Sequence, residues 1–289
     1  MRVAITGATG FVGTHLVSAL SRQGDEVVPI GRAELRGDSR QLAELLSGCE
    51  LVINLAGAPI NRRWTPAYKK EIRSSRIDTT RALVSAMARL EERPGTLISA
   101  SGIGAFDSAR RYSEADLPNA TDFLGQLSLD WEAAAQEAEA LGVRVIIMRF
   151  AVVLGRDGGM MKQVLPPFRF GLGGPIGNGR QHFSWVHIDD LVAAILHASD
   201  KLQMSGVYHV SAPNPVSNRD FARALGKAVR RPAVLPMPTP MLKLAFGEGA
   251  DVMTSGQCVV SERLPESGFK FRYPRIDQAL SEIVSTASN

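Results

Sequence analysis

The feature that most constrains this chain is a strand, a glycine-rich turn and a helix at its very beginning. Residues 3–5 form a short apolar run, glycines follow at Gly7, Gly10 and Gly13, and apolar residues then recur at helical spacing. A glycine turn between a buried strand and a helix presents free backbone N–H groups to a pyrophosphate, aided by the helix dipole. The pattern predicts a dinucleotide-binding turn.

Each glycine has a different expected task. Gly7 permits a tight turn, Gly10 has no side chain to hold a pyrophosphate away, and Gly13 lets the helix pack close to the strand. The spacing is G-x-x-G-x-x-G rather than G-x-G-x-x-G. A glycine turn that binds no ligand therefore remains the alternative.

The second predicted strand, residues 26–30, bears on the choice of cofactor. An acid after this strand binds the ribose 2′-hydroxyl of NAD, whereas a base accommodates the 2′-phosphate of NADP. Arg32 occupies this place, and no acid follows the strand before Glu34. The sequence favours NADP (NADPH) over NAD; the alternative is that Arg32 is only a surface arginine.

Further apolar strands alternate with helical segments, which predicts an α/β fold with a Rossmann-type doubly wound parallel sheet. The later strands are expected at residues 50–55, 96–101 and 143–150, and the helices between them at residues 40–46, from 66 onward and at 123–141.

From residue 155 the rhythm changes to glycine-rich loops and short elements. We expect an NAD(P)-binding domain over residues 1–239, with loops of a smaller substrate lobe within 155–187, and a small C-terminal domain over 240–289. Asp189 or Asp190 is expected to cap the helix that begins at residue 191, and Ser217 to cap a helix that begins at 219.

Composition narrows the possible partners. Lys and Arg number 33 against 29 Asp and Glu, and the basic residues are scattered rather than interleaved with aromatics, so we expect no nucleic acid partner. Neither the two cysteines, Cys49 and Cys258, nor the histidines show metal-ligand spacing. No apolar run approaches membrane-spanning length and no leader precedes the first strand, so we expect a cytoplasmic protein with a small-molecule substrate and no membrane partner. The oligomeric state stays open.

Residues 6–13, Thr-Gly-Ala-Thr-Gly-Phe-Val-Gly, resemble the turn of the extended short-chain dehydrogenase/reductase superfamily. More narrowly, the chain resembles the atypical "epimerase family", named for NAD-dependent epimerases and dehydratases and carrying a small extra C-terminal domain. The stretches that carry this resemblance are residues 54–60, 63–65, 71–76, 153–159, 171–190 and 268–274.

The resemblance implies a set of cofactor contacts at the turn and at the ends of the next two strands. For Glu71 and Arg76 a pair on a helix surface is the alternative, although a spacing of five is poor for direct contact. The implied residues are Gly7, Thr9, Gly10, Phe11, Val12, Gly13, Arg32, Leu55, Ala56, Gly57, Glu71 and Arg76.

The acid–base chemistry of the superfamily is missing. Its hydride-transferring members use a serine, a tyrosine, and a lysine four residues after the tyrosine, which lowers the tyrosine pKa. None of the four tyrosines here has a lysine four residues later, and alignment on Trp131 places Leu124 and Ser128 at those positions. Ser101 matches the serine. Tyr112, on the loop that follows, is the other catalytic candidate.

Three functions remain open at this point. The first is an NADP-dependent oxidoreductase or epimerase-like enzyme with unconventional acid–base groups, for which His187 is a further candidate; a structural histidine in an apolar run is the alternative. The second is a non-catalytic NADP(H)-binding sensor or partner-binding protein. A nucleotide-sugar epimerase is disfavoured because that chemistry needs the tyrosine base.

Overall fold

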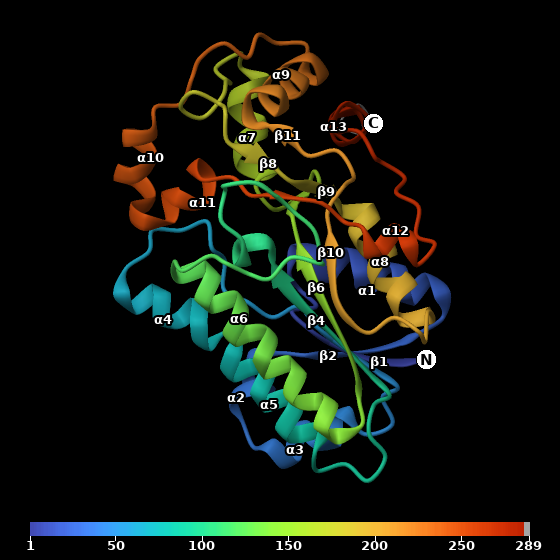
Figure 1. Ribbon diagram of the computed structural model, residues 1–289. Helices are drawn as coiled ribbons and strands as arrows, with labels where there is room; N and C mark the ends of the chain where they lie inside the picture. Colours follow the sequence, from blue (N-terminus) through green and yellow to red (C-terminus); the bar gives the residue numbers. More distant parts are fainter. Residues whose placement is uncertain (286–289) are drawn as a thin grey trace.

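The computed structural model describes residues 1–285 and is built around a six-stranded parallel sheet (Figure 1). The strand order is β10-β6-β4-β3-β1-β2. The chain therefore adds β2 on one side of β1 and its later strands on the other side, so the order reverses between β1 and β3. Ligands of open α/β sheets bind at such a switch point. The predicted Rossmann-type fold is confirmed. The strands are β1 (Arg2–Thr6), β2 (Glu26–Ile30), β3 (Leu51–Asn54), β4 (Thr96–Gly102), β6 (Arg144–Phe150) and β10 (Gly206–Val210).

Helices cover both faces of the sheet because its strands are apolar on both sides. On one face α1 (Phe11–Gln23), α8 (Ile188–Asp200) and α12 (Arg263–Glu266) pack over the buried side chains of Ile5 and Ile53. On the other, α3 (Ser39–Leu46), α5 (Ile77–Met87) and α6 (Phe123–Gln136) are adjacent to the sheet, where Val52 and Leu97 are buried. The sheet is thus the central layer of three.

The helix expected from residue 66 onward is two helices, α4 (Pro66–Ser74) and α5. Thr65 caps α4, since its side chain accepts from the N–H of Tyr68. The break has a visible cause: the Ser75 hydroxyl accepts from the N–H of Ala58 at 2.9 Å and donates to the carbonyl of Ile72. This contact draws the junction towards the end of β3.

A smaller lobe of α7 (Met161–Arg169), α9 (Asn218–Val229), α10 (Thr239–Phe246) and α11 (Asp251–Thr254) lies above the sheet (Figure 1). Short strand pairs support it, β7 (Val152–Leu154) with β9 (Trp185–His187) and β8 (His182–Phe183) with β11 (Val216–Ser217). Ser217 caps α9 as expected. No helix within residues 1–285 has the length and apolar character that crossing a bilayer requires.

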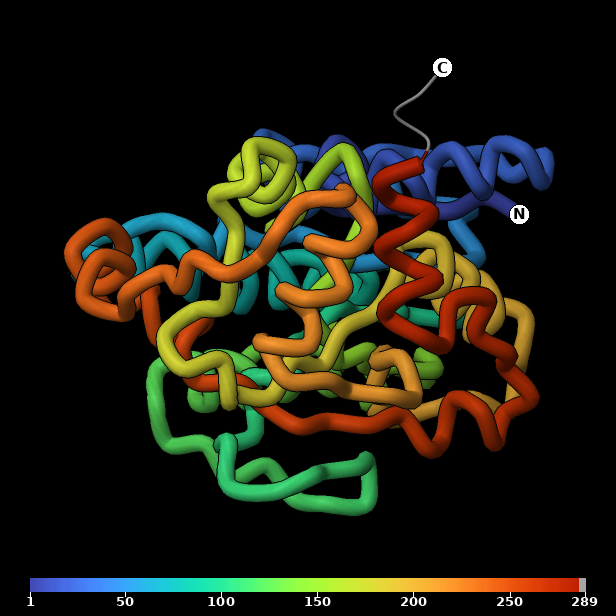
Figure 2. Tube along the Cα trace, turned by 90° about the horizontal axis from the view of Figure 1, so that it is seen from above, coloured from blue at the N-terminus to red at the C-terminus, as the bar shows by residue number. Residues whose placement is uncertain are grey.

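The C-terminal segment returns across both parts of the molecule. Strand β12 (Cys258–Val259) pairs with β5 (Arg111–Tyr112), and α13 (Ile276–Ser285) runs beside α9 (Figure 2). Asp190 anchors this segment, because its buried carboxylate accepts from the N–H groups of Arg272 at 2.7 Å and Tyr273 at 2.9 Å.

The expectation that Asp189 or Asp190 caps α8 is therefore wrong. The helix begins at Ile188, and His187 precedes it with its Nδ1 accepting from the N–H of Asp189. Asp190 lies inside the first turn and faces the C-terminal segment instead. Burial raises the pKa of its carboxyl, although the two backbone bonds oppose the shift.

Candidate functional site

Two of the three glycines in the turn after β1 are required by packing inside the protein. Gly7 has a φ of +69°, and a β-carbon there would lie 2.8 Å from the carbonyl oxygen of Leu55. A β-carbon at Gly13 would lie 2.1 Å from the carbonyl oxygen of Gly7. These two positions explain how the turn and helix α1 pack against the sheet.

Gly10 is different, because its backbone is extended (φ −77°, ψ 173°) and suits any residue. A β-carbon would meet a single atom within 4 Å, the Gly7 carbonyl oxygen at 3.1 Å, a contact that a small shift relieves. Gly10 immediately precedes α1, and no side chain caps this 13-residue helix. Packing alone does not require a glycine here, whereas a phosphate seated on the helix start does.

The side chains around the turn differ in their surroundings. Thr9 is exposed, whereas Val12 is half-buried. The Phe11 ring packs against the loop after β7, since a β-carbon at Gly158 would lie 2.3 Å from that ring. The turn is therefore fixed from the lobe side while its outer surface stays open.

At the end of β2, Arg32 is the first residue of the short helix α2 (Arg32–Arg36), and it is exposed. The first acid after the strand, Glu34, folds back and accepts from the N–H of Gly31 at 3.0 Å. The carboxylate that would otherwise bind a ribose is thus occupied by the backbone, and the base remains at the strand end.

The end of β3 is shaped by Thr6. Its hydroxyl accepts from the N–H groups of Leu55 and Ala56, both at 3.1 Å, and donates to Asn54 Oδ1 at 2.7 Å. These bonds hold the small residues after β3 close to Gly7. The backbone of β3 and the glycine turn therefore form one continuous surface.

Arg76 reaches this surface from the junction of α4 and α5. Its guanidinium lies against Gly57, where a β-carbon would be 2.8 Å from Cζ, and it donates to the carbonyls of Ala58 at 3.1 Å and Ile72 at 3.3 Å. Burial lowers the pKa of Arg76 to about 10. Within residues 1–285 it forms no ion pair, and Glu71 is exposed on α4 rather than joined to it.

Ser101, the expected catalytic serine, belongs to a closed buried network. Its hydroxyl donates to Glu132 Oε1 at 2.6 Å, and Arg149 binds both oxygens of the same carboxylate at 2.7 Å. Ser101 and Arg149 are register partners on β4 and β6. All three side chains are buried. The Arg149 guanidinium therefore provides the counter-charge that the Glu132 carboxylate needs inside the protein.

Leu124 and Ser128 lie on α6 against the 3₁₀ turn η1 (Ile103–Ala105) that follows β4. A β-carbon at Gly104 would be 3.2 Å from Leu124 Cβ and 3.8 Å from Ser128 Oγ. The two positions therefore face the loop beyond the serine. The sequence alignment predicts a phenol and an ammonium at these two positions in the superfamily, and this chain has an aliphatic group and a small hydroxyl there.

Tyr112 lies on β5 with its ring stacked on Phe106. Its hydroxyl donates to Asp107 and accepts from Asn119 Nδ2 at 2.9 Å. The hydrogen bond to Asp107, followed by burial, raises the pKa of Tyr112. This geometry opposes a phenolate base near neutral pH.

His187 is buried and partnered on both sides. Its Nε2 lies 3.0 Å from a carboxylate oxygen of Glu282, and its ring packs against Tyr273 at 4.1 Å between centroids. A cavity of about 250 Å³ opens beside it, between the start of α8 and His15 on α1. These contacts are those of a histidine that joins α8 to α13.

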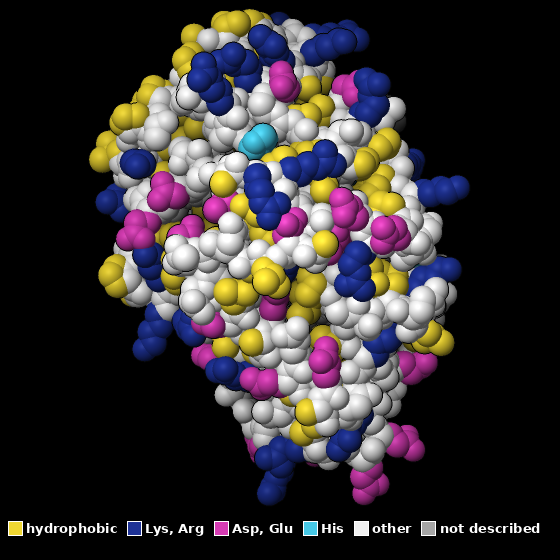
Figure 3. All heavy atoms as spheres, in the orientation of Figure 1, with side chains coloured by type: hydrophobic (Ala, Val, Ile, Leu, Met, Phe, Trp, Pro, Cys, Tyr) yellow, Lys and Arg dark blue, Asp and Glu magenta, His cyan; other side chains and the backbone are white. Residues whose placement is uncertain are grey.

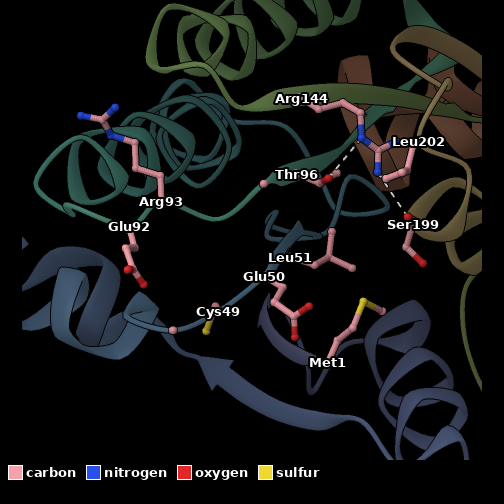
Figure 4. Close-up of a pocket in the computed structure, with 12 residues that line it drawn as sticks. Met1, Cys49, Glu50, Leu51, Glu92, Arg93, Thr96, Arg144, Ser199 and Leu202 are labelled. Atoms are coloured by element: carbon pink, nitrogen blue, oxygen red, sulfur yellow. Dashed lines mark hydrogen bonds between the residues drawn. The ribbon is translucent and has the colours of Figure 1, made fainter.

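A larger cavity of about 440 Å³ lies at the other edge of the sheet, near the amino ends of β3, β4 and β6 (Figure 4). Arg144 crosses it, donating to Thr96 Oγ1 and to the carbonyl of Ser199, both at 3.2 Å. Its remaining bonds go to the carbonyl of Ala198 in the last turn of α8 and to those of Lys201 and Met204 just beyond it. Arg144 therefore satisfies the last carbonyls of that helix, and the cavity is separate from the glycine turn.

Sequence reasoning missed Glu132 and Thr6, which organise the two halves of the carboxyl edge. A signal for the first was present: Arg149 directly follows the apolar run of residues 145–148 in a predicted central strand, and a buried arginine needs a carboxylate partner. No comparable signal identified Thr6, because a threonine at a strand end is common and its hydrogen-bond partners are set by the tertiary fold.

Comparison with known proteins decides the family. The model of the NAD dependent epimerase/dehydratase family matches residues 3–211. The chain belongs to this family. A second model, described as a domain of unknown function (DUF1731), matches residues 237–283.

Relatives in this family match the chain over nearly all its length. "Epimerase family protein SDR39U1" of Mus musculus is 38% identical over 99% of this chain and 100% of its own. "Epimerase family protein YfhF" of Bacillus subtilis is 34% identical over 99% and 98%. The crystal structure of human SDR39U1 (isoform 2) with NADPH superimposes with a TM-score of 0.91 at 35% identity, covering 99% of each chain.

More distant structures share the fold alone. UDP-N-acetylglucosamine 4-epimerase of Bacillus cereus is 18% identical with a TM-score of 0.79, covering 100% of each chain.

Proposed function

We propose that this protein is an atypical short-chain dehydrogenase/reductase that binds NADP(H) in preference to NAD(H) and performs oxidoreductase or epimerase-like chemistry on a small molecule. The observation that carries the proposal is the exposed Arg32 at the end of β2, beside a Glu34 already bound to Gly31. The NADPH in the human relative's structure supports the same cofactor.

The residues at the carboxyl edge fit a phosphate-bearing dinucleotide. Gly10 leaves the uncapped start of α1 accessible, while Arg32 and Arg76 supply positive charge from either side. When bound, the cofactor supplies or accepts a hydride at its nicotinamide ring. The chain's part is to bind the cofactor and to orient it.

The groups available for proton transfer are few. The Ser101 hydroxyl already donates its hydrogen bond to Glu132. Its oxygen can therefore act only as an acceptor towards a further partner, which suits a substrate hydroxyl. Leu124 and Ser128 provide no base. We therefore expect slow turnover on ordinary ketones and nucleotide sugars, unless the substrate carries its own acid–base group.

Titration of the unmodified protein with NADPH and NADH, followed by nicotinamide fluorescence, tests the cofactor. A contact of Arg32 to the 2′-phosphate predicts about tenfold or more tighter binding of NADPH. Equal affinities would contradict the proposal.

A second candidate is a non-catalytic NADP(H)-binding sensor. It is favoured by the hydrogen-bonded, high-pKa Tyr112 and by the aliphatic side chain at position 124. A turnover screen with NADPH over small carbonyl compounds separates the two, since a sensor binds the cofactor without oxidising it.

We also propose a cytoplasmic location with no nucleic acid partner, from composition. The relative from Arabidopsis thaliana is described as chloroplastic, so members of the family differ in location.

A further inference from the structure

Positive charge is concentrated on one part of the lobe. Residues 160–182 and 213–246, here called the lobe surface, contain nine Lys or Arg and a single Asp, a net charge of +8. The whole chain has a net charge of +4, so the remaining residues sum to −4. All nine basic residues are exposed, and within the described chain only Arg223 has an ion-pair partner, Asp220.

The same segments expose most of the large apolar side chains. Seven of the eleven exposed large hydrophobic residues in the described chain lie there, with 42–80% of their surface accessible. In Figure 3, Lys and Arg gather over α9 at the top, and hydrophobic side chains cover α10 on the upper left. The seven are Phe170, Leu172, Val234, Leu235, Met237, Met241 and Leu244.

These residues belong to one continuous, ordered surface. The N–H of Leu235 donates to the carbonyl of Gly173 at 3.2 Å, and that of Met237 to Pro175 at 2.8 Å. Arg231 Nε donates to the carbonyl of Arg169 at 3.2 Å, next to Phe170. Helix α10 follows directly, with two of the seven side chains on it. The apolar groups are therefore held outward by a bonded framework.

We propose that the lobe surface binds peripherally to a bilayer containing anionic phospholipids. Its apolar side chains would enter the interfacial region, and the surrounding Lys and Arg would contact the headgroups. The expectation of no membrane partner rested on the lack of a spanning segment, and peripheral binding needs none.

Other occupants fit less well. A second copy would bring two surfaces of +8 together, which repel. Protein hot spots are enriched in Trp, Tyr and Arg, and the lobe surface has arginines but neither of the two aromatic residues that anchor such interfaces. Proteins that bind single-stranded nucleic acid stack its bases on exposed aromatics between basic residues, and Phe170 is the one large exposed aromatic on this surface.

Sedimentation with vesicles tests the proposal on the full-length protein. We expect binding to phosphatidylcholine vesicles that contain phosphatidylserine, little binding to phosphatidylcholine alone, and release by added salt. Failure to bind the anionic vesicles overturns the proposal. Retention on polyglutamate without vesicle binding also overturns it and assigns the surface to an acidic protein.

Paired variants locate the contact. Arg169→Gln with Lys243→Gln should weaken anionic vesicle binding about thirtyfold, at about fivefold for each charge. Phe170→Ser with Leu172→Ser should weaken it by at least about tenfold.

The matched controls are Arg89→Gln, an exposed arginine on the sheet domain, and Leu202→Ser, which is 80% exposed beside the cavity at the opposite edge of the sheet. Both should bind like the unmodified protein. Equal losses in the controls and in the lobe variants would overturn the assignment. Circular dichroism of each variant confirms that it is folded.

Discussion

The two halves of the sheet's carboxyl edge differ in how their polar groups are hydrogen-bonded and buried. Over β1 and β2, the start of α1 is uncapped, Gly10 has space around it, and Arg32 is exposed. Over β4 and β6, the Ser101 hydroxyl, the Glu132 carboxylate and the Arg149 guanidinium bond to one another and are buried. The polar groups over β1 and β2 are available to bind a ligand, whereas those over β4 and β6 are bonded to one another.

This contrast separates binding from chemistry. A binding site formed by backbone N–H groups has donors without partners until the ligand binds. A hydrogen-bond network that stabilises the fold has its donors and acceptors paired within the protein. The half over β1 and β2, where we propose that the cofactor binds, is called the cofactor half below. The half over β4 and β6, where the sequence alignment predicts the phenol and ammonium of the superfamily, contains an internal ion pair in this protein. The predictions below test this division, beginning with the largest expected effect.

The ion pair should matter for stability far more than for cofactor binding. Glu132→Gln leaves the buried Arg149 charge without a counter-charge, which should lower the free energy of unfolding by about 3–5 kcal/mol. Denaturant unfolding measures the loss, and NADPH affinity at low temperature should be unchanged. The exposed pair of Arg81 and Glu137 provides the control: Glu137→Gln should cost no more than about 1 kcal/mol. Equal losses in the free energy of unfolding for Glu132→Gln and Glu137→Gln would show that the buried pair has no special role in stability.

Gly10 should show the opposite pattern. Gly10→Val places a side chain where the pyrophosphate meets the helix start, and losing two or more charge-assisted bonds should weaken NADPH binding by at least about a hundredfold. Its folding should be nearly normal, because the backbone of Gly10 is extended and a β-carbon there meets a single atom within 4 Å, the Gly7 carbonyl oxygen.

Gly13→Ala is the comparison for this variant, since its β-carbon would lie 2.1 Å from the Gly7 oxygen. It should destabilise the protein outright. A Gly10→Val protein that binds NADPH normally would show that the turn is only structural.

The difference between the halves also explains what could be predicted from sequence. Strand β2 and the helix start at Pro66 follow from local signals, an apolar run between turns and a Thr-Pro cap, and the structure has both. The parallel sheet follows from the alternation of strands and helices. Such features depend on neighbours in the sequence.

Residues that act across the sequence were harder to predict. Asp190 was expected to cap a helix, but its carboxylate binds N–H groups of Arg272 and Tyr273, about eighty residues away. The break before α5 depends on Ser75 meeting Ala58. Local propensity carries no information about such partners.

Arg32 tests the cofactor half more finely. Arg32→Ala should remove a contact to the 2′-phosphate of about 1.5–3 kcal/mol and bring NADPH affinity close to that of NADH. Parallel fluorescence titrations give both constants. Arg36→Ala, an exposed arginine on the same short helix, should keep the preference. An unchanged preference in Arg32→Ala would place the 2′-phosphate elsewhere.

The closed half should also respond to pH through His209, the register partner of Arg149 on β10. Burial lowers its pKa, opposed by the nearby Glu114 carboxylate and reinforced by Arg149. The folded state therefore binds fewer protons than the unfolded state below about pH 6.5, the ordinary histidine value. Stability should fall as pH drops from there towards the folded pKa, by at most about 1.4 kcal/mol per unit.

Unfolding measured across this range, with His209→Gln, isolates the effect. The variant should lose that part of the slope, whereas His182→Gln, at an exposed histidine, should keep it. A slope unaffected by either substitution would assign the pH dependence to other groups.

Ser101 gives the smallest and most informative effect, because it belongs to the closed network and also matches the superfamily's serine. If the network is its main role, Ser101→Ala should cost about 1 kcal/mol of stability, since Arg149 still binds both oxygens of Glu132. Any residual turnover with NADPH should fall less than about tenfold, the value of one hydrogen bond to the reacting oxygen. Single-turnover rates on the folded variant measure this directly. A loss of about a hundredfold or more would mean that Ser101 and Glu132 together move a proton, and the chemical half of the edge would then be a working site rather than a structural one.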